Sequence, residues 1–142
     1  MSCFWDTLFR NINHKPRSFY VIDYYAKKEY DLIDYYKKVP KNIQELCLLF
    51  KEKNKLTKHV MCNGEQITEK QMKENYEHVK NYDTKTMNSG YLCSTFDPFL
   101  FLTSELFEVK VINNYMTFQV VYENRNKNNY EIIVNNNDSH MW

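Results

Sequence analysis

The spacing of apolar residues changes at Glu108, and this change limits the possible folds more than any other pattern in the chain. Before it, apolar side chains recur every three or four residues, as in amphipathic helices; after it, they follow the extended pattern of strands. Segments 109–112, 117–122 and 130–134 predict three antiparallel strands joined by Asn-rich turns. Helices followed by a short meander predict an α+β fold, with helices packed on a small, mainly antiparallel β-sheet.

Residues 3–12 and 42–56 predict the first amphipathic helices. In the first of them, Phe4 and Leu8 are one helical turn apart on the same face. In the second, Cys47 falls on the apolar face, so its thiol is expected in the core. The Tyr-rich residues 20–25 and 30–36 are expected to form one or two further helices. Residues 124–129, between the last two predicted strands, are expected to be a solvated hairpin loop.

Two further helices have recognisable starting signals. Thr68 and Gln71 fit a capping box, which predicts a helix over 69–80. Asp97 precedes a proline at the first helical position, which predicts a buried helix ending near residue 107. Asn63 and the glycine after it predict a turn.

Length and charge limit the classes of protein. A chain of 142 residues supports one domain, which we expect to span 1–142. Nineteen Lys and Arg against eighteen Asp and Glu leave a net charge of +1, so binding to nucleic acid through counterion release is not expected. No apolar run reaches the ~18 residues of a membrane span, and no signal peptide is recognisable. We therefore expect a cytoplasmic monomer that binds neither nucleic acid nor membranes.

The candidate chemistry lies at the two ends of the chain. Cys3 opens the first predicted helix, where unpaired backbone N–H groups and the helix dipole stabilise a thiolate. His140 lies just past the last predicted strand and is a candidate base for that thiol. The base needs an acceptor to orient its ring, and Asp138 is our first candidate, with Asn137 and Asn136 as alternatives. The alternative is that Cys3 and His140 have no catalytic role and lie in ordinary exposed termini.

Other clusters favour packing over chemistry. His59 and Cys62 have the spacing of half a metal site, but no second pair lies nearby to complete four ligands, so no metal is expected. Cys93 precedes the buried helix and is expected to pack. The four cysteines lack Cys-x-x-Cys spacing and are expected to be reduced. The chain has two glycines and no Gly-rich phosphate loop, so no cofactor is expected.

Three stretches together resemble the ovarian-tumour (OTU) family of cysteine proteases, most of which remove ubiquitin from proteins. Residues 3–8, with the sequence Cys-Phe-Trp-Asp-Thr-Leu, resemble the start of the family's nucleophile helix. Residues 90–96 and the helix and strand after them are similar to its central helix and following strand. Residues 131–134, running on to His140, resemble its last strand and catalytic histidine. The abundance of Asn, Lys, Tyr and Ile indicates an AT-rich genome, such as that of a large DNA virus or a protist.

The resemblance implies an OTU-like, papain-type fold and a thiol-dependent isopeptidase that acts on ubiquitin or a ubiquitin-like modifier, in the host cytosol if the source is viral. It implies Cys3 as nucleophile and His140 as general base. The family usually has Asp-Gly-Asn before its cysteine, whereas Met1 and Ser2 stand here, so the expected oxyanion donors are the backbone N–H groups of Ser2 and Cys3. The alternatives are a catalytically inactive OTU-like domain that binds a partner protein, and a structural protein of a viral particle.

Overall fold

The computed structural model describes residues 3–14, 40–137 and 139–142. The segments 20–25 and 30–36, for which helices were expected, lie outside these ranges. The described helices and strands are, in chain order, α1 (Cys3–His14), α4 (Ile43–Glu52), β1 (Val60–Cys62), β2 (Glu65–Gln66), α5 (Glu69–Asn81), the 3₁₀ helix η1 (Thr84–Ser89), α6 (Pro98–Phe107), β3 (Lys110–Tyr115), β4 (Phe118–Asn124) and β5 (Glu131–Asn136).

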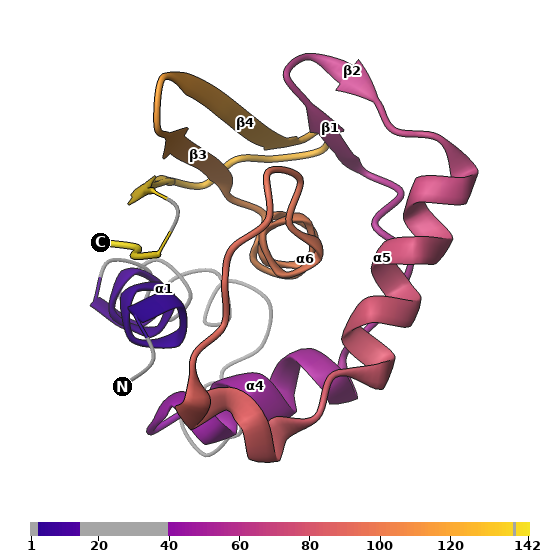
Figure 1. Ribbon diagram of the computed structural model, residues 1–142. Helices are drawn as coiled ribbons and strands as arrows, with labels where there is room; N and C mark the ends of the chain where they lie inside the picture. The colour runs from indigo at the N-terminus through magenta and orange to yellow at the C-terminus, as the bar shows by residue number, and fades with distance from the viewer. Residues whose placement is uncertain (1–2, 15–39, 138) are drawn as a thin grey trace, which may run out of the picture.

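Helix α6 lies at the centre of the described fold. Figure 1 shows the sheet on one side of it, α5 on another, and α1 and α4 on the remaining sides. Its sequence is apolar on nearly every face, and Pro98–Glu105 are all buried. A helix that is hydrophobic all round must be surrounded by other elements. The α+β class, with helices packed on a small sheet, is confirmed.

The sheet contains five strands in the described residues, in the order β2-β1-β4-β3-β5. Three of its pairings are antiparallel, as expected for a mainly antiparallel sheet, but β5 pairs parallel to β3. The prediction of three antiparallel strands is therefore wrong for β5. Strands β1 and β2 were missed because they are only three and two residues long. The turn predicted at Asn63 joins them, and Asn63 and Gly64 both have positive φ, as a tight two-residue hairpin requires.

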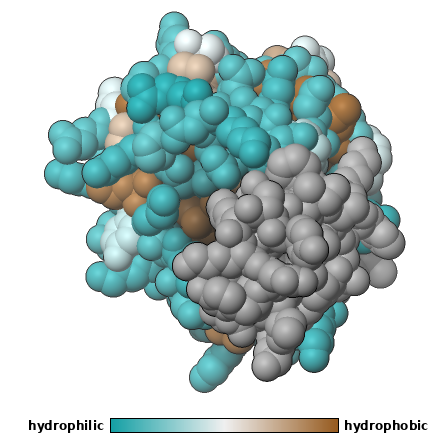
Figure 2. All heavy atoms as spheres, turned by 180° about the vertical axis from the view of Figure 1, so that it is seen from behind, coloured by the Kyte–Doolittle hydropathy of each residue, from teal (hydrophilic) through white to brown (hydrophobic). Residues whose placement is uncertain are grey.

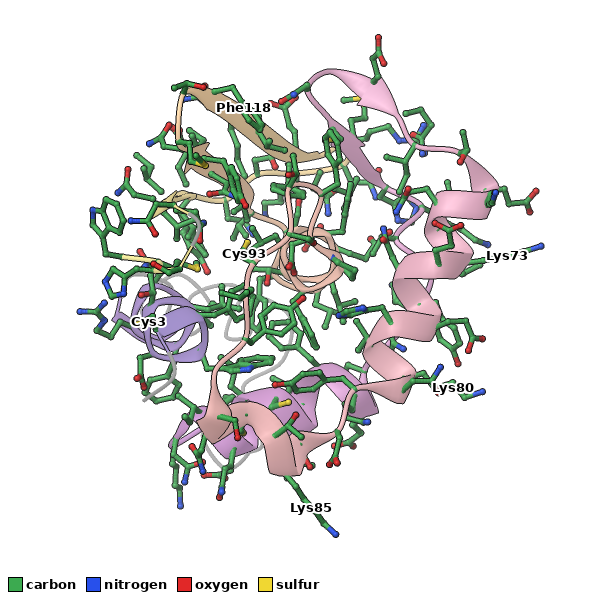
Figure 3. The ribbon with its side chains drawn as sticks, in the orientation of Figure 1. Cys3, Lys73, Lys80, Lys85, Cys93 and Phe118 are labelled. Atoms are coloured by element: carbon green, nitrogen blue, oxygen red, sulfur yellow. The ribbon has the colours of Figure 1, made fainter. Side chains whose placement is uncertain are left out.

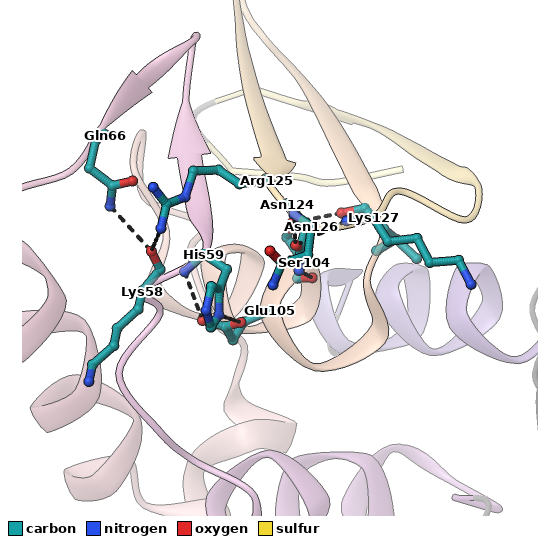
Figure 4. Close-up of polar contacts among 10 residues, drawn as sticks. Lys58, His59, Gln66, Ser104, Glu105, Asn124, Arg125, Asn126 and Lys127 are labelled. Atoms are coloured by element: carbon teal, nitrogen blue, oxygen red, sulfur yellow. Dashed lines mark hydrogen bonds and ion pairs between the residues drawn. The ribbon is translucent and has the colours of Figure 1, made fainter. Parts of the chain in front are cut away.

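The segment 124–129 is not the hairpin loop that was predicted. Strands β4 and β5 run in opposite directions, but β3 lies between them in the sheet. The connection from β4 to β5 therefore crosses one end of β3, and the two strands that it joins are not hydrogen-bonded to each other. Asn124 stabilises this crossing: its Oδ1 accepts from the backbone N–H of Asn126, and its Nδ2 donates to the Ser104 carbonyl at the end of α6 (Figure 4). The polar side chains thus satisfy the backbone of the connection and are not simply solvated.

The predicted helix starts are confirmed at Thr68 and Asp97. Thr68 Oγ1 accepts from the Gln71 backbone N–H, and Asp97 Oδ1 accepts from the Phe99 backbone N–H. The helix predicted over 42–56 is shorter than expected, since α4 ends at Glu52. The short 3₁₀ helix η1 was not predicted.

Aromatic rings join α1 to the centre of the fold. Trp5 is fully buried and meets the ring of Phe99 on α6 edge-on at 4.8 Å between centroids. Phe4 packs against Tyr91 at 4.6 Å. These buried aromatic contacts fix α1, and with it Cys3, against the core.

Seen from behind, the described surface is mainly hydrophilic, with hydrophobic residues in small separate patches (Figure 2).

Candidate functional site

Cys3 is the first residue of α1, and the helix holds it in place. Phe4, Leu8 and Ile12 are buried on the inner face of α1, while Cys3 is half-buried at its start. As the first helical residue, Cys3 has a backbone N–H without an acceptor inside the helix. The sequence pattern of α1 thus places a thiol at the positive end of a helix dipole, next to a backbone N–H that has no acceptor inside the helix.

His140 is brought to Cys3 by the way in which the chain folds back after β5. The backbone N–H and C=O of Trp142 pair with those of Asn135, and Met141 forms a bridge with Asn136. Thr7 Oγ1 on α1 donates to the Met141 carbonyl at 3.3 Å. These bonds tie the last residues both to the sheet and to α1, so the end of the chain is not a free terminus.

The two predicted residues face one another directly. Cys3 Sγ lies 2.8 Å from His140 Nδ1, across a sequence separation of 137 residues. This distance is within hydrogen-bonding reach, as a nucleophile and its base require. Figure 3 shows Cys3 at the start of α1, on the side of the molecule where the chain ends. The expected convergence of the two ends is therefore present.

The His140 ring is held by contacts that the sequence did not predict. The Trp142 ring stacks on it with 5.6 Å between centroids and 19° between planes. Asn137, one of the candidate ring acceptors, instead uses its Oδ1 to accept from the backbone N–H groups of Ser139 and His140. Within the described residues, no side chain accepts a hydrogen bond from His140 Nε2. Asn137 therefore shapes the loop, and Trp142 contacts the ring.

The remaining predicted site residues are placed as follows. Asn136, the other alternative acceptor, is buried and donates through Nδ2 to Asn113 Oδ1 at 2.6 Å, so it does not orient the ring. Asp138 and Ser2 lie outside the described residues. The roles predicted for these two residues stay predictions.

A small cavity of about 20 Å³ lies at the cysteine–histidine pair. It is lined by Cys3 and Phe4 of α1, by the segment 91–93, and by residues 136–137 and 139–141. A volume of this size holds about one water molecule.

Tyr91 supports the wall of this cavity through a buried polar network. Its hydroxyl donates to Asp97 Oδ2 at 2.8 Å and also lies 3.2 Å from His78 Nε2. Asp97 Oδ2 additionally accepts from the backbone N–H and the hydroxyl of Ser94. Burial raises the pKa of Asp97, and burial together with the neighbouring Asp97 charge raises the pKa of the Tyr91 hydroxyl. The sequence predicted Asp97 only as a helix cap, so this network was not predicted.

The other three cysteines differ from Cys3 in their surroundings. Cys47 is buried as expected, and burial raises the pKa of its thiol to about 11. Burial likewise raises the pKa of Cys62 to about 11. Cys93 accepts a weak hydrogen bond from Asn113, and burial, assisted by Asp97, raises the pKa of its thiol. These three thiols stay protonated near neutral pH, so they are poor nucleophiles.

His59 is paired with a carboxylate. Its Nδ1 lies 3.0 Å from Glu105 Oε2, and its backbone N–H donates to Glu105 Oε1 (Figure 4). Sequence reasoning missed Glu105, although a charged residue in a mainly apolar helix was a recognisable signal. No group of three or more His, Cys, Asp or Glu side chains that could hold a metal is present in residues 3–14, 40–137 and 139–142.

Among the described helices, none is both long and apolar enough to cross a membrane. No family model matches the chain, and neither a curated protein nor a solved structure matches it.

Proposed function

We propose that this chain is a thiol-dependent isopeptidase of the OTU type, with Cys3 as nucleophile and His140 as general base. The observation that carries the proposal is the 2.8 Å contact between Cys3 Sγ and His140 Nδ1. A contact between residues so far apart in sequence requires the whole fold, and a thiol at a helix start facing an imidazole is the arrangement that nucleophilic catalysis by cysteine needs.

The order of elements also supports the proposal. Helix α1 carries the cysteine, the central helix α6 is followed directly by strand β3, and β5 leads to the histidine. This is the order that the resemblance implies for an OTU-like fold. On the same resemblance and the AT-rich residue usage, we propose that a large DNA virus encodes the chain and that it acts as a monomer in the host cytosol.

The reaction begins with proton transfer from Cys3 Sγ to His140 Nδ1. The thiolate attacks the carbonyl carbon at the last residue of ubiquitin or a ubiquitin-like modifier, and the isopeptide C–N bond breaks as His140 protonates the leaving lysine amine. Water, deprotonated by His140, then hydrolyses the thioester, and the proton returns to the sulfur. The backbone N–H groups of Cys3 and Ser2 are the proposed donors to the oxyanion. The stacked ring of Trp142 limits rotation of the base between these steps.

A ubiquitin derivative whose C-terminus carries a thiol-reactive electrophile tests the proposal. We expect one covalent adduct with the unmodified chain, no adduct with Cys3→Ala and a strongly reduced rate with His140→Ala. Cys62→Ala is the matched control, because Cys62 is also half-buried but lies away from His140. It should label at the full rate.

The opposite results distinguish the alternatives. Labelling of Cys3→Ala would show that another thiol reacts and would contradict the assignment of the nucleophile. A folded chain that binds ubiquitin or another protein without labelling would instead be the inactive binding domain.

A further inference from the structure

Positive charge gathers on two loops at one end of the sheet. Residues 51–59 and 124–129 contain six Lys and Arg and one Glu, which is a net charge of +5. Because the whole chain has a net charge of +1, all its other residues together have a net charge of −4. The charges are therefore segregated, although the overall charge is close to zero. Five exposed side chains of the two loops form a basic surface: Lys53, Lys55, Lys58, Arg125 and Lys127.

Arg125 joins the two loops. Its backbone N–H donates to the His59 carbonyl at 2.7 Å, and its Nη2 donates to the Lys58 carbonyl at 3.2 Å. Gln66 Nε2 donates to the same Lys58 carbonyl at 3.4 Å. Figure 4 shows the Lys58 and Lys127 side chains extending away from these bonds. The basic surface thus combines a backbone that is held in place with long, exposed cationic side chains.

The carboxylates of neighbouring elements do not neutralise these lysines. Glu105 is buried and Glu108 is half-buried at the end of α6. Glu123 on β4 pairs with Lys110 at 3.7 Å. Among the described residues, no carboxylate forms an ion pair with any lysine of the segment 53–58. The positive charge of this segment is therefore open to an anionic partner.

The basic surface and the cysteine–histidine pair lie at opposite ends of β3 and β5. Both strands begin at the 124–129 connection, where the Lys110 backbone N–H donates to the Tyr130 carbonyl. Both end beside the cavity at Cys3, which Asn136 lines (Figure 1). A strand of six residues spans about 17 Å. A partner bound to the basic surface therefore leaves the thiol uncovered.

We propose that the basic surface binds a short, extended segment of a partner protein that is rich in Asp and Glu. Charge complementarity indicates an anion. The net charge of −4 on the rest of the chain indicates a short one, because a long polyanion reaching beyond the surface is repelled. Lys ammonium groups are point charges on flexible stems, so they pair with successive carboxylates without requiring a single geometry.

The composition of the two loops favours a protein segment over nucleic acid. Residues 51–59 and 124–129 contain no Phe, Tyr or Trp on which a base can stack. The proposal goes beyond the isopeptidase, since it concerns what holds a second protein to this chain and not the reaction at Cys3. The acidic segment keeps its protein close to the chain while the thiol stays accessible.

A fluorescent synthetic peptide of alternating Glu and Ser tests the proposal, with binding measured by fluorescence anisotropy. We expect saturable binding at low salt that weakens as salt is added, because exposed charges are screened. A triple variant with Lys53→Gln, Lys55→Gln and Lys58→Gln should bind the peptide about 3- to 150-fold more weakly, since three exposed charge pairs are lost.

The matched control changes three exposed lysines on other elements: Lys41→Gln, Lys70→Gln and Lys85→Gln. It alters the net charge by the same amount, so it should bind the peptide within about twofold of the unmodified chain if the local surface attracts it. Thermal unfolding and iodoacetamide alkylation of Cys3 are measured for all three proteins. Both should be unchanged, because the substituted lysines are exposed and none of them lines the cavity at Cys3.

Three results would overturn the proposal. They are no binding of the peptide at low salt, unchanged binding by the variant of the 53–58 lysines, and an equal loss in both triple variants. A single-stranded oligonucleotide of equal charge, or a vesicle containing phosphatidylserine, that binds more tightly than the peptide would also overturn it, by identifying a different occupant. Absence of labelling by the ubiquitin electrophile contradicts the isopeptidase alone, because peptide binding is measured independently of Cys3.

Discussion

Replacing Trp142 by alanine tests whether ring stacking holds the base in its reactive orientation. The Trp142 and His140 rings are 5.6 Å apart at their centroids and nearly parallel, at 19°. The backbone of Trp142 pairs with Asn135 in both directions, and this pairing does not need the indole. The substitution therefore removes the stacked ring and leaves the loop that carries His140 in place.

The size of the effect follows from the stacking energy. An aromatic pair contributes about 0.5–1.5 kcal/mol beyond its buried area. If that energy holds one ring orientation, its loss lowers the fraction of His140 rings that face Cys3 by about 2- to 12-fold. Because the Trp142 side chain is 52% exposed, the free energy of unfolding should fall by only about 1 kcal/mol.

The assay is the second-order rate of Cys3 alkylation by iodoacetamide near neutral pH, read by mass spectrometry, with thermal unfolding measured alongside. Trp142→Ala should slow alkylation by the factor above. Trp142→Phe keeps an aromatic face and should react within about twofold of the unmodified chain. Equal rates for all three proteins would refute the reasoning. A slow alanine variant that is also substantially unfolded would assign the loss to folding and not to ring orientation.

Three further predictions concern the surroundings of the site. Thr7→Val removes the hydroxyl that donates to the Met141 carbonyl. The free energy of unfolding in urea should therefore fall by about 1–2 kcal/mol. An unchanged midpoint of urea unfolding would show that this bond does not tie α1 to the end of the chain. Because burial raises the pKa of Asp97, the folded state binds a proton more readily than the unfolded state. The contribution of Asp97 to stability is therefore complete below its pKa in the unfolded chain and is lost as pH rises through its raised pKa in the folded protein. As pH falls from neutral, the free energy of unfolding of the unmodified chain should rise relative to that of Asp97→Asn. A difference between the two proteins that does not change with pH would contradict this prediction. Burial raises the pKa of the Cys47 thiol to about 11, so iodoacetamide should leave Cys47 unmodified until urea unfolds the protein, and modification of the folded protein as fast as Cys3 is the opposing result.

Local chemistry was sufficient to predict several elements of the fold. The caps at Thr68 and Asp97 and the turn at Asn63 each depend on hydrogen bonds or backbone angles within a few residues. The partner of β5 could not be predicted in this way. The alternation of Ile132 and Val134 fixes which face of β5 is buried, but pairing with β3 or β4 buries the same face. The choice depends on how the chain crosses the end of the sheet.

In the candidate site, too, the sequence was sufficient to predict some features and not others. The positions of Cys3 and His140 at a helix start and after a strand were sufficient to pair them, because those are the places where a thiol and a base are presented. The partner of the ring was not predictable from residue type alone. Asn137 had the right chemistry to orient the ring, but its oxygen is used by two backbone N–H groups of its own loop. Trp142 carries no acceptor and contacts the ring by its face.

The rate of Cys3 alkylation in His140→Ala tests the central claim most directly. The account predicts that this variant, with its fold intact by circular dichroism, reacts at least about tenfold more slowly than the unmodified chain near neutral pH, since no other described group lies within hydrogen-bonding distance of Cys3 Sγ. His59→Ala is the control, because His59 pairs with Glu105 away from the site and its loss should leave the rate unchanged. Equal reactivity of Cys3 with and without His140 would contradict the claim that the two ends of the chain form one catalytic pair.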